Sequence, residues 1–178
     1  MKNEKSPYNI RIGVVPVGEV PEIAPKVVAA HFVGYLNLST DIFPPLELPG
    51  YAFDKRRSQY DAGLIIKSFE SMQFDNCDKV IGILDVDLFV PLFTHVFGEA
   101  RLGGKCALIS LFRMEKNPER AAKTALHEFG HLCDLQHCTD KNCLMHFSKG
   151  LEELDSIPLC FCRYCSAYLR DAFCRLSL

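Results

Sequence analysis

The chain has 178 residues, of which 48% are hydrophobic and 24% are charged, and its formal net charge is −2. This is the composition of an ordinary globular protein, and the length suits one domain with a real core. We therefore expect a single domain over residues 1–178, with a sheet-and-helix part (1–137) and a cysteine-rich part (138–178). The small net charge gives no reason to expect nucleic acid or an anionic membrane as a partner.

Neither export nor membrane insertion is expected. Residues 1–7 contain no apolar segment of the kind that a secretory signal needs. The most apolar stretch, residues 80–93, is interrupted by Asp85 and Asp87 and is too short to span a bilayer. We therefore expect the nine cysteines to lie in a reducing cytoplasm, where clustered cysteines bind metal more often than they form disulfides.

In chain order, strand and helix patterns alternate over the first 115 residues. Runs of β-branched residues predict buried strands at 10–17, 80–86 and 106–112, and apolar residues at helical spacing predict helices at 24–36 and about 58–72. Between them Asn37 and residues 39–41 mark the end of the first helix, and residues 43–48 form at most an edge strand. We also expect a surface turn from residue 55 and a short strand at 95–100 that Gly98 weakens or bulges. This alternation predicts an α/β fold with a largely parallel sheet and helices packed on it.

Two further helices are expected in the second half of the chain. Asn117, Pro118 and Glu119 suit a helix start, because Asn caps, Pro fits the first turn and Glu faces the positive helix end. Residues 163–176 form the last helical pattern, after a cysteine-rich segment without regular periodicity.

The first of these helices carries residues with a recognisable chemistry. His127 and His131 are four residues apart, so they lie on one helix face and can hold one metal ion. Imidazole suits zinc, and three protein ligands leave a fourth position for water. Glu128 stands beside the first histidine, where a carboxylate can take a proton from that water. The stretch predicts a zinc hydrolase site, and the alternative is two helical histidines without a metal.

His137 can join this site only if the helix stops. Six more helical residues would carry His137 about 9 Å along the axis, too far to reach the same metal. We expect the break at Asp134, because Asp is among the few non-glycine residues that adopt a positive φ at moderate cost. A role for Asp134 as an extra ligand is the alternative. Gly130 lowers helix propensity, which predicts close packing at that position.

The cysteines after His137 predict a second metal site. Cys138 and Cys143 form one short-spaced pair and Cys162 and Cys165 another, a pattern that fits a closed zinc site of four thiolates. Because Cys138 directly follows His137, that site would also fix the third histidine. Cys160 in place of Cys162, or a redox-active C-x2-C pair, are the alternatives. The other cysteines are expected to be buried small hydrophobic residues: Cys77, Cys106, Cys133 and Cys174.

Taken together, residues 127–165 resemble the archaemetzincins, zinc metallopeptidases of the metzincin clan whose long zinc motif is followed by four cysteines and a methionine. The matching residues are His127, Glu128, His131, His137, Cys138, Cys143, Met145, Cys162 and Cys165. The resemblance continues upstream over residues 85–91, 96–100 and 110–111. Two features depart from the family pattern: Asp134 stands where glycine is expected, and the spacing from Met145 to Cys162 is about one residue shorter.

The resemblance implies both fold and roles. It implies a metzincin-like twisted sheet of about five mostly parallel strands with an antiparallel edge strand, flanked by helices, followed by an irregular zinc-stapled region and a C-terminal helix. It implies His127, His131 and His137 as ligands of a catalytic zinc, Glu128 as general base and acid, Met145 as the Met-turn residue beneath the metal, and Cys138, Cys143, Cys162 and Cys165 as ligands of a structural zinc.

We therefore predict a zinc metallopeptidase with two zinc ions per chain, in which Glu128 activates a zinc-bound water to hydrolyse peptide bonds. We expect a peptide or protein substrate and a monomer, and the resemblance implies a cleft between residues 95–100 and the segment after His137. The alternative is a latent or inactive zinc-binding protein that uses the same fold as a binding module. Nucleic-acid binding by the cysteine cluster is not favoured, because residues 138–178 lack a basic stripe.

Three polar residues near these motifs have less definite expectations. Asp85 and Asp87 follow a buried strand, so they either accept hydrogen bonds from the metal-binding histidines or stabilise a turn. His146 is expected to be a polar neighbour of the site and not a ligand.

Overall fold

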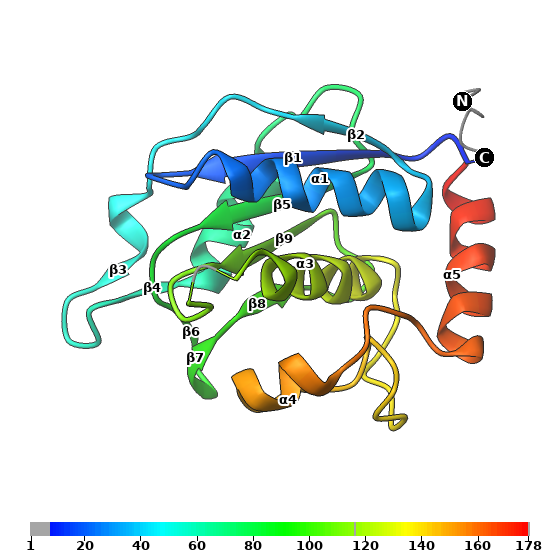
Figure 1. Ribbon diagram of the computed structural model, residues 1–178. Coiled ribbons are helices and arrows are strands. Elements are labelled where there is room, and N and C mark those ends of the chain that lie inside the picture. Colours follow the sequence, from blue (N-terminus) through cyan, green and yellow to red (C-terminus); the bar gives the residue numbers. More distant parts are fainter. Residues whose placement is uncertain (1–7, 116, 178) are drawn as a thin grey trace.

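The computed structural model describes residues 8–115 and 117–177, and its centre is a five-stranded sheet (Figure 1). The strand order is β2-β1-β5-β9-β8, and every neighbouring pair is parallel except β8 and β9, which are antiparallel. The bounds are β1 (Arg11–Val17), β2 (Ser39–Ile42), β5 (Lys79–Leu84), β8 (Gly98–Ala100) and β9 (Cys106–Ser110). The expected mostly parallel sheet with an antiparallel edge strand is confirmed.

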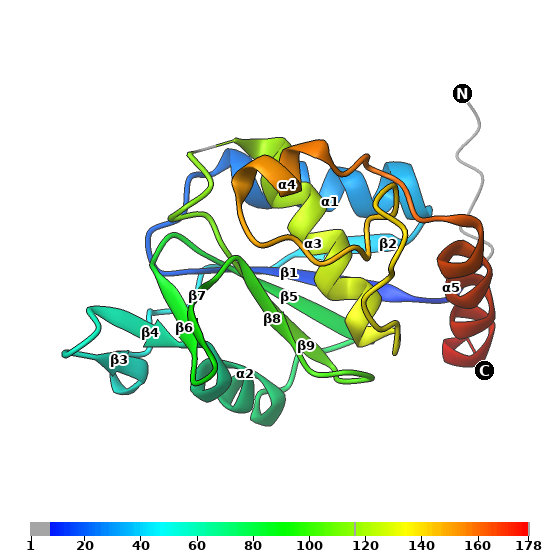
Figure 2. The same ribbon diagram turned by 90° about the horizontal axis from the view of Figure 1, so that it is seen from below.

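The central strands are apolar on both faces because helices cover both faces. Every residue of β5 and β9 is buried, as is typical of parallel strands between two helical layers. Helices α1 (Ile23–Leu36) and α3 (Pro118–Leu132) cover one face, and α2 (Ala62–Ser71) covers the other (Figure 2). The larger apolar core joins α1, α3 and α5 (Arg163–Leu176) to the sheet, and a smaller core lies under α2.

A second, smaller sheet extends the molecule beyond the main one. Its order is β3-β4-β6-β7, with bounds β3 (Phe53–Asp54), β4 (Gln59–Asp61), β6 (Leu88–Val90) and β7 (Phe93–Val96). Arg113 donates two hydrogen bonds of 2.7 Å to the Asp87 carboxylate, and Gln59 donates a third of 3.0 Å. Asp87 therefore fastens this sheet to the loop after β9 and makes none of its hydrogen bonds to the histidines of the α3 region.

Helix α3 begins and ends as its sequence predicts. The Asn117 side chain accepts hydrogen bonds from the backbone N–H groups of Glu119 and Arg120, which caps the first turn. At the other end Asp134 has a φ of +72°, and the N–H of Leu135 donates to the carbonyl of Gly130 at 3.0 Å. This six-to-one hydrogen bond is the Schellman arrangement, and it turns the chain back toward the helix.

Several expected boundaries are wrong, and each error involves strand pairing. Residues 39–41, expected to mark the end of the first helix, lie in β2. Residues 43–48, expected to be at most an edge strand, form an isolated bridge to β1 at Leu46, and the N–H of Phe43 donates to the Val14 carbonyl at 2.9 Å. Gln59 to Asp61 form β4, so the second helix starts only after Asp61, whose side chain caps it. The expected strand at 95–100 is two strands, β7 and β8, which belong to different sheets.

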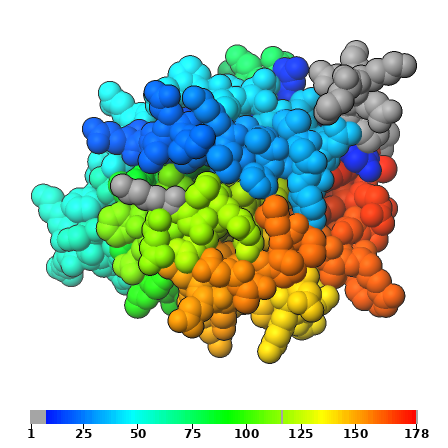
Figure 3. Space-filling view, viewed as in Figure 1, coloured from blue at the N-terminus to red at the C-terminus, as the bar shows by residue number. Residues whose placement is uncertain are grey.

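The C-terminal part packs across α3 and beside α1 (Figure 3). It contains one short helix, α4 (Leu151–Ser156), before α5; neither α4 nor the short helical turn η1 (Gly50–Ala52) was expected. The ring of Phe173 on α5 contacts those of Tyr8 and Phe129, which joins the last helix to the main core. Within the described ranges, no helix is long and apolar enough to cross a membrane.

Candidate active site

The three histidines of the motif converge on one point. His127 and His131 come from α3, and the break at Asp134 brings His137 back beside them. Their Nε2 atoms are 3.1 Å apart for His127 and His131, and 3.3 Å apart for His131 and His137. Two nitrogens that bind one tetrahedral zinc ion at the usual bond length are separated by about 3.3–3.4 Å. The spacing of these nitrogens therefore fits a zinc ion.

Backbone carbonyls orient two of the rings. The Nδ1 of His127 lies 2.8 Å from the Leu144 carbonyl, and the Nδ1 of His131 lies 2.7 Å from the Leu135 carbonyl. Each contact requires a proton on Nδ1, which leaves a lone pair on each Nε2. The Nε2 atoms of His127 and His131 are 3.1 Å apart, so their lone pairs repel each other unless a cation lies between them. The donor set is therefore suited to a metal ion.

The local electrostatics keep these rings neutral, which metal binding requires. Burial, together with the neighbouring His131, lowers the pKa of His127 to about 3. Burial also lowers the pKa values of His131 and His137.

Glu128 is buried in the angle between α3 and β8. Burial raises the pKa of the Glu128 carboxyl well above its usual range, and the nearby charge of Glu99 acts in the same direction. The carboxylate fits there because β8 begins with a glycine: a Cβ on Gly98 would lie only 2.5 Å from Glu128 Oε1. Gly98 therefore makes room for the acid beside the histidines, a role that the sequence did not indicate.

If Glu128 is the general base that the sequence predicts, we expect Gly98→Ala to lower kcat/KM for peptide hydrolysis by about 100-fold, the effect of moving a catalytic group by roughly 1 Å. Zinc content should stay unchanged, because the histidines do not contact the added methyl group. Gly34→Ala is the matched control, since nothing lies within 4 Å of a Cβ at that position. Steady-state kinetics and metal analysis of both variants test this, and full activity in Gly98→Ala would contradict it.

Met145 lies under the same helix. It is fully buried, and its sulfur occupies the space that a Cβ on Gly130 would need. The close packing expected at Gly130 is thus confirmed, and Met145 is the residue that packs there.

The four cysteines of the two short-spaced pairs also converge. The sulfur atoms of Cys138, Cys143, Cys162 and Cys165 all lie within 4.8 Å of one another. Cys138 Sγ and Cys162 Sγ are 3.9 Å apart, close to the roughly 3.8 Å between two thiolates on one tetrahedral zinc ion. The Cys160 side chain is exposed and lies outside this group, 3.7 Å from the Asn142 carbonyl. Of the cysteines expected to be buried, Cys174 is exposed.

One loop connects the two clusters. The N–H of Cys138 donates to the Met145 carbonyl at 2.8 Å, and His146 Nδ1 lies 3.0 Å from the Cys138 carbonyl. His146 is thus a polar neighbour that braces the loop, and it is not among the three converging histidines. The segment that carries His137 is therefore tied, through the backbone of Cys138, to the turn at Met145 and His146.

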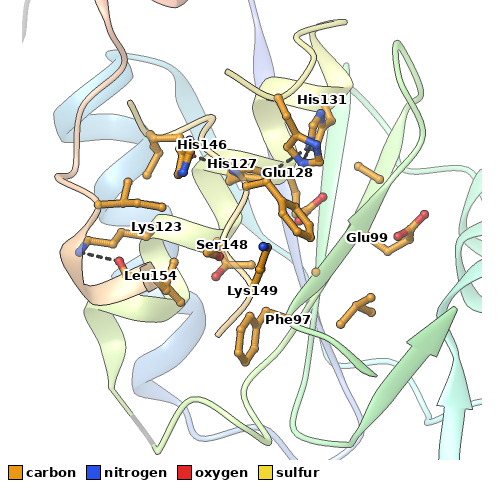
Figure 4. Close-up of a pocket in the computed structure, with 18 of the residues that line it drawn as sticks. Phe97, Glu99, Lys123, His127, Glu128, His131, His146, Ser148, Lys149 and Leu154 are labelled. Atoms are coloured by element: carbon orange, nitrogen blue, oxygen red, sulfur yellow. Dashed lines mark hydrogen bonds between the residues drawn. The ribbon is translucent and has the colours of Figure 1, made fainter. Parts of the chain in front are cut away.

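A cleft of about 820 Å³ opens over Glu128 and the histidines (Figure 4). Strands β7 and β8 form one wall, residues 144–149 and α4 form the other, and α3 forms the floor. This is the cleft expected between residues 95–100 and the segment after His137.

Comparisons with known proteins identify the family of this chain. Residues 38–171 match the model of peptidase family M54. The archaemetzincin of Methanocaldococcus jannaschii is 35% identical over 182 aligned positions, which cover 95% of this chain and 98% of that protein. The chain belongs to peptidase family M54, the archaemetzincins.

Solved structures of archaemetzincins and a related peptidase share the fold of this chain. The crystal structure of the Methanopyrus kandleri archaemetzincin superposes with a TM-score of 0.83 at 32% identity, covering 93% of this chain and 96% of that chain. A zinc-dependent peptidase from Methanocorpusculum labreanum gives a TM-score of 0.79 at 25% identity, covering 89% and 99%. As an archaemetzincin, the protein is a zinc metallopeptidase whose substrates are peptides or proteins.

Proposed function

We propose that His127, His131 and His137 hold a catalytic zinc ion and that Glu128 is the general base of a peptide-bond hydrolase. The observation that carries this proposal is the 3.1 Å distance between the Nε2 atoms of His127 and His131, whose lone pairs face each other. The buried carboxyl of Glu128 beside them supports it, because a protein that only bound zinc would not need an acid there.

The chemistry follows from these positions. A zinc ion held there supplies Lewis acidity, which polarises the peptide carbonyl and lowers the pKa of water. Glu128 takes a proton from the attacking water and returns it to the nitrogen of the leaving amine. Burial raises the pKa of Glu128, which favours its holding the proton between these two transfers.

We further propose a structural zinc ion on Cys138, Cys143, Cys162 and Cys165, which makes two zinc ions per chain. The 3.9 Å sulfur spacing supports this assignment, as does the exposed position of Cys160 outside the cluster. The structural zinc would fix Cys138 and thereby His137, and Met145 would support α3 from below. Four thiolates persist best in a reducing compartment, so we place the protein in the cytoplasm.

All proposed ligands and the base come from one chain, so we propose that the protein acts as a monomer. The larger core contains residues from β1 to α5, which supports the chain acting as one domain.

Zinc-dependent turnover tests the proposed function. We expect the zinc-loaded protein to cleave members of a peptide library, cleavage to stop after chelation, and added zinc to restore it. A latent zinc-binding protein, the alternative, would show the same negligible cleavage before and after chelation. That result would contradict the proposed hydrolase.

A further inference from the structure

Two aromatic side chains meet across the mouth of the cleft. Phe93 belongs to β7 in one wall, and Phe147 belongs to the segment after Met145 in the other. Their ring centroids are 6.3 Å apart, yet Phe93 remains 49% exposed and Phe147 41% exposed. The pair bridges the two walls and leaves about half of each aromatic residue available for further burial.

This apolar surface lies beside the proposed catalytic metal. The Phe147 ring packs edge-on against the imidazole of His137, with centroids 5.0 Å apart. Consecutive Cα atoms of a peptide are about 3.8 Å apart. A peptide whose carbonyl reaches the histidines therefore carries a neighbouring side chain within reach of Phe147.

Among the described residues that line the cleft, few charged groups are free to bind a substrate side chain beside Phe147. Lys123 is buried and donates to the carbonyls of Leu154 and Asp155 at 3.2 Å each. Glu99 also lines the cleft, but it follows Gly98 on β8, so its side chain points to the opposite face of the strand from Glu128 (Figure 4). Lys149 is the remaining cation, and it is exposed.

Much of the remaining lining is apolar. Leu102 is 52% exposed at the same cleft, and other apolar residues complete the walls: Val96, Phe97, Leu144 and Ile157. Exposed apolar surface that is continuous with a binding cleft is typical of a recognition surface.

We propose that Phe93 and Phe147 form a subsite that selects an aromatic or large aliphatic side chain next to the bond that is cleaved. This inference rests on the proposed function and names its substrate class. Burying such a side chain against the exposed surface of the two rings removes apolar surface of both partners from water. This burial favours these substrates over those with small or charged residues.

The test compares peptides that differ only at one of the two positions flanking the cleaved bond, cut by the zinc-loaded full chain. We expect kcat/KM for Phe or Leu at one of these positions to exceed that for Ala or Asp by at least about tenfold. In Phe93→Ala and Phe147→Ala this ratio should fall to less than about threefold. The ratio compares two peptides cut by the same preparation, so a change in the fraction of active enzyme does not affect it.

Tyr51→Ala is the matched control, because Tyr51 is a 62% exposed aromatic residue that does not line the cleft, and its ratio should stay at the wild-type value. Phe147 contacts His137, so Phe147→Ala can also disturb the histidine site. The specificity ratio of Phe93→Ala, measured on protein with unchanged zinc content, is therefore the deciding result for the subsite. Wild-type cleavage without apolar preference, or a preference unaffected in Phe93→Ala, would overturn the subsite and leave the hydrolase intact. A preference for acidic residues that Lys149→Ala removes would also overturn it. Absence of any zinc-dependent cleavage would instead refute the proposed function.

Discussion

Glu128→Gln is expected to lower kcat for peptide hydrolysis by about 10²–10⁴-fold, the usual contribution of a general base. The amide keeps nearly the shape of the carboxylate but cannot accept the proton of the attacking water. Glu128 is not one of the converging nitrogen donors, so zinc content should remain at the wild-type value. Single-turnover kinetics together with metal analysis of the purified variant measure both quantities.

Glu99→Gln is the matched control for that substitution, because Glu99 is a second acid that lines the same cleft. It should keep most of the activity. Its charge raises the pKa of Glu128, so its removal should lower that pKa and move the acid limb of the pH profile to lower pH. Equal losses in the two variants would mean that Glu128 has no special role.

Cys143→Ser is expected to affect both metal sites. Cys143 is fully buried, and its sulfur accepts the N–H of Cys162 at 3.3 Å. Loss of a structural metal is among the few single changes that cost more than about 4–5 kcal/mol. For a chain of this length we expect Tm to fall by about 10 °C or more. Activity should fall as well, because the freed Cys138 no longer holds His137.

The control is Cys160→Ser, which removes an exposed thiol from the same segment but from outside the cluster. Its Tm, measured by thermal unfolding, and its activity should match those of the wild-type protein. If Cys143→Ser behaved like Cys160→Ser, the thiolate site would have no structural role.

The sequence predicts the histidine-bearing helix well, because the relevant geometry is local. A separation of four residues on a helix is enough to place His127 and His131 on one face. His137 can lie beside these two histidines only if the helix ends before it, and the helix does end at Asp134, which has a φ of +72°. The glycine expected there is thus replaced by an aspartate that adopts the same left-handed conformation.

The sequence could not predict features that depend on residues distant along the chain. The carbonyls of Leu135 and Leu144 orient two histidines, and a backbone carbonyl has no side-chain signature. The role of Gly98 appears only when β8 lies against α3, where Glu128 fills the space of the missing Cβ.

Strand pairing caused the fold errors for the same reason. Ser39–Ile42 is a strand because it pairs with β1, and its own polar residues suggest a loop. The single strand expected at 95–100 is two strands in the structure, because β7 pairs with β6 whereas β8 pairs with β9. Whether such a segment forms a strand depends on pairing with segments that are distant in the sequence, and a local pattern does not contain that information.

Zinc per chain, measured by elemental analysis on the wild-type protein and on two variants, tests the two-site account most directly. We predict two zinc ions in the wild-type protein and one in His131→Ala, which keeps the thiolate site. We predict fewer than one in Cys143→Ser, because loss of the structural zinc also weakens the hold on His137. A single zinc ion in the wild-type protein, or the same loss in both variants, would contradict the account.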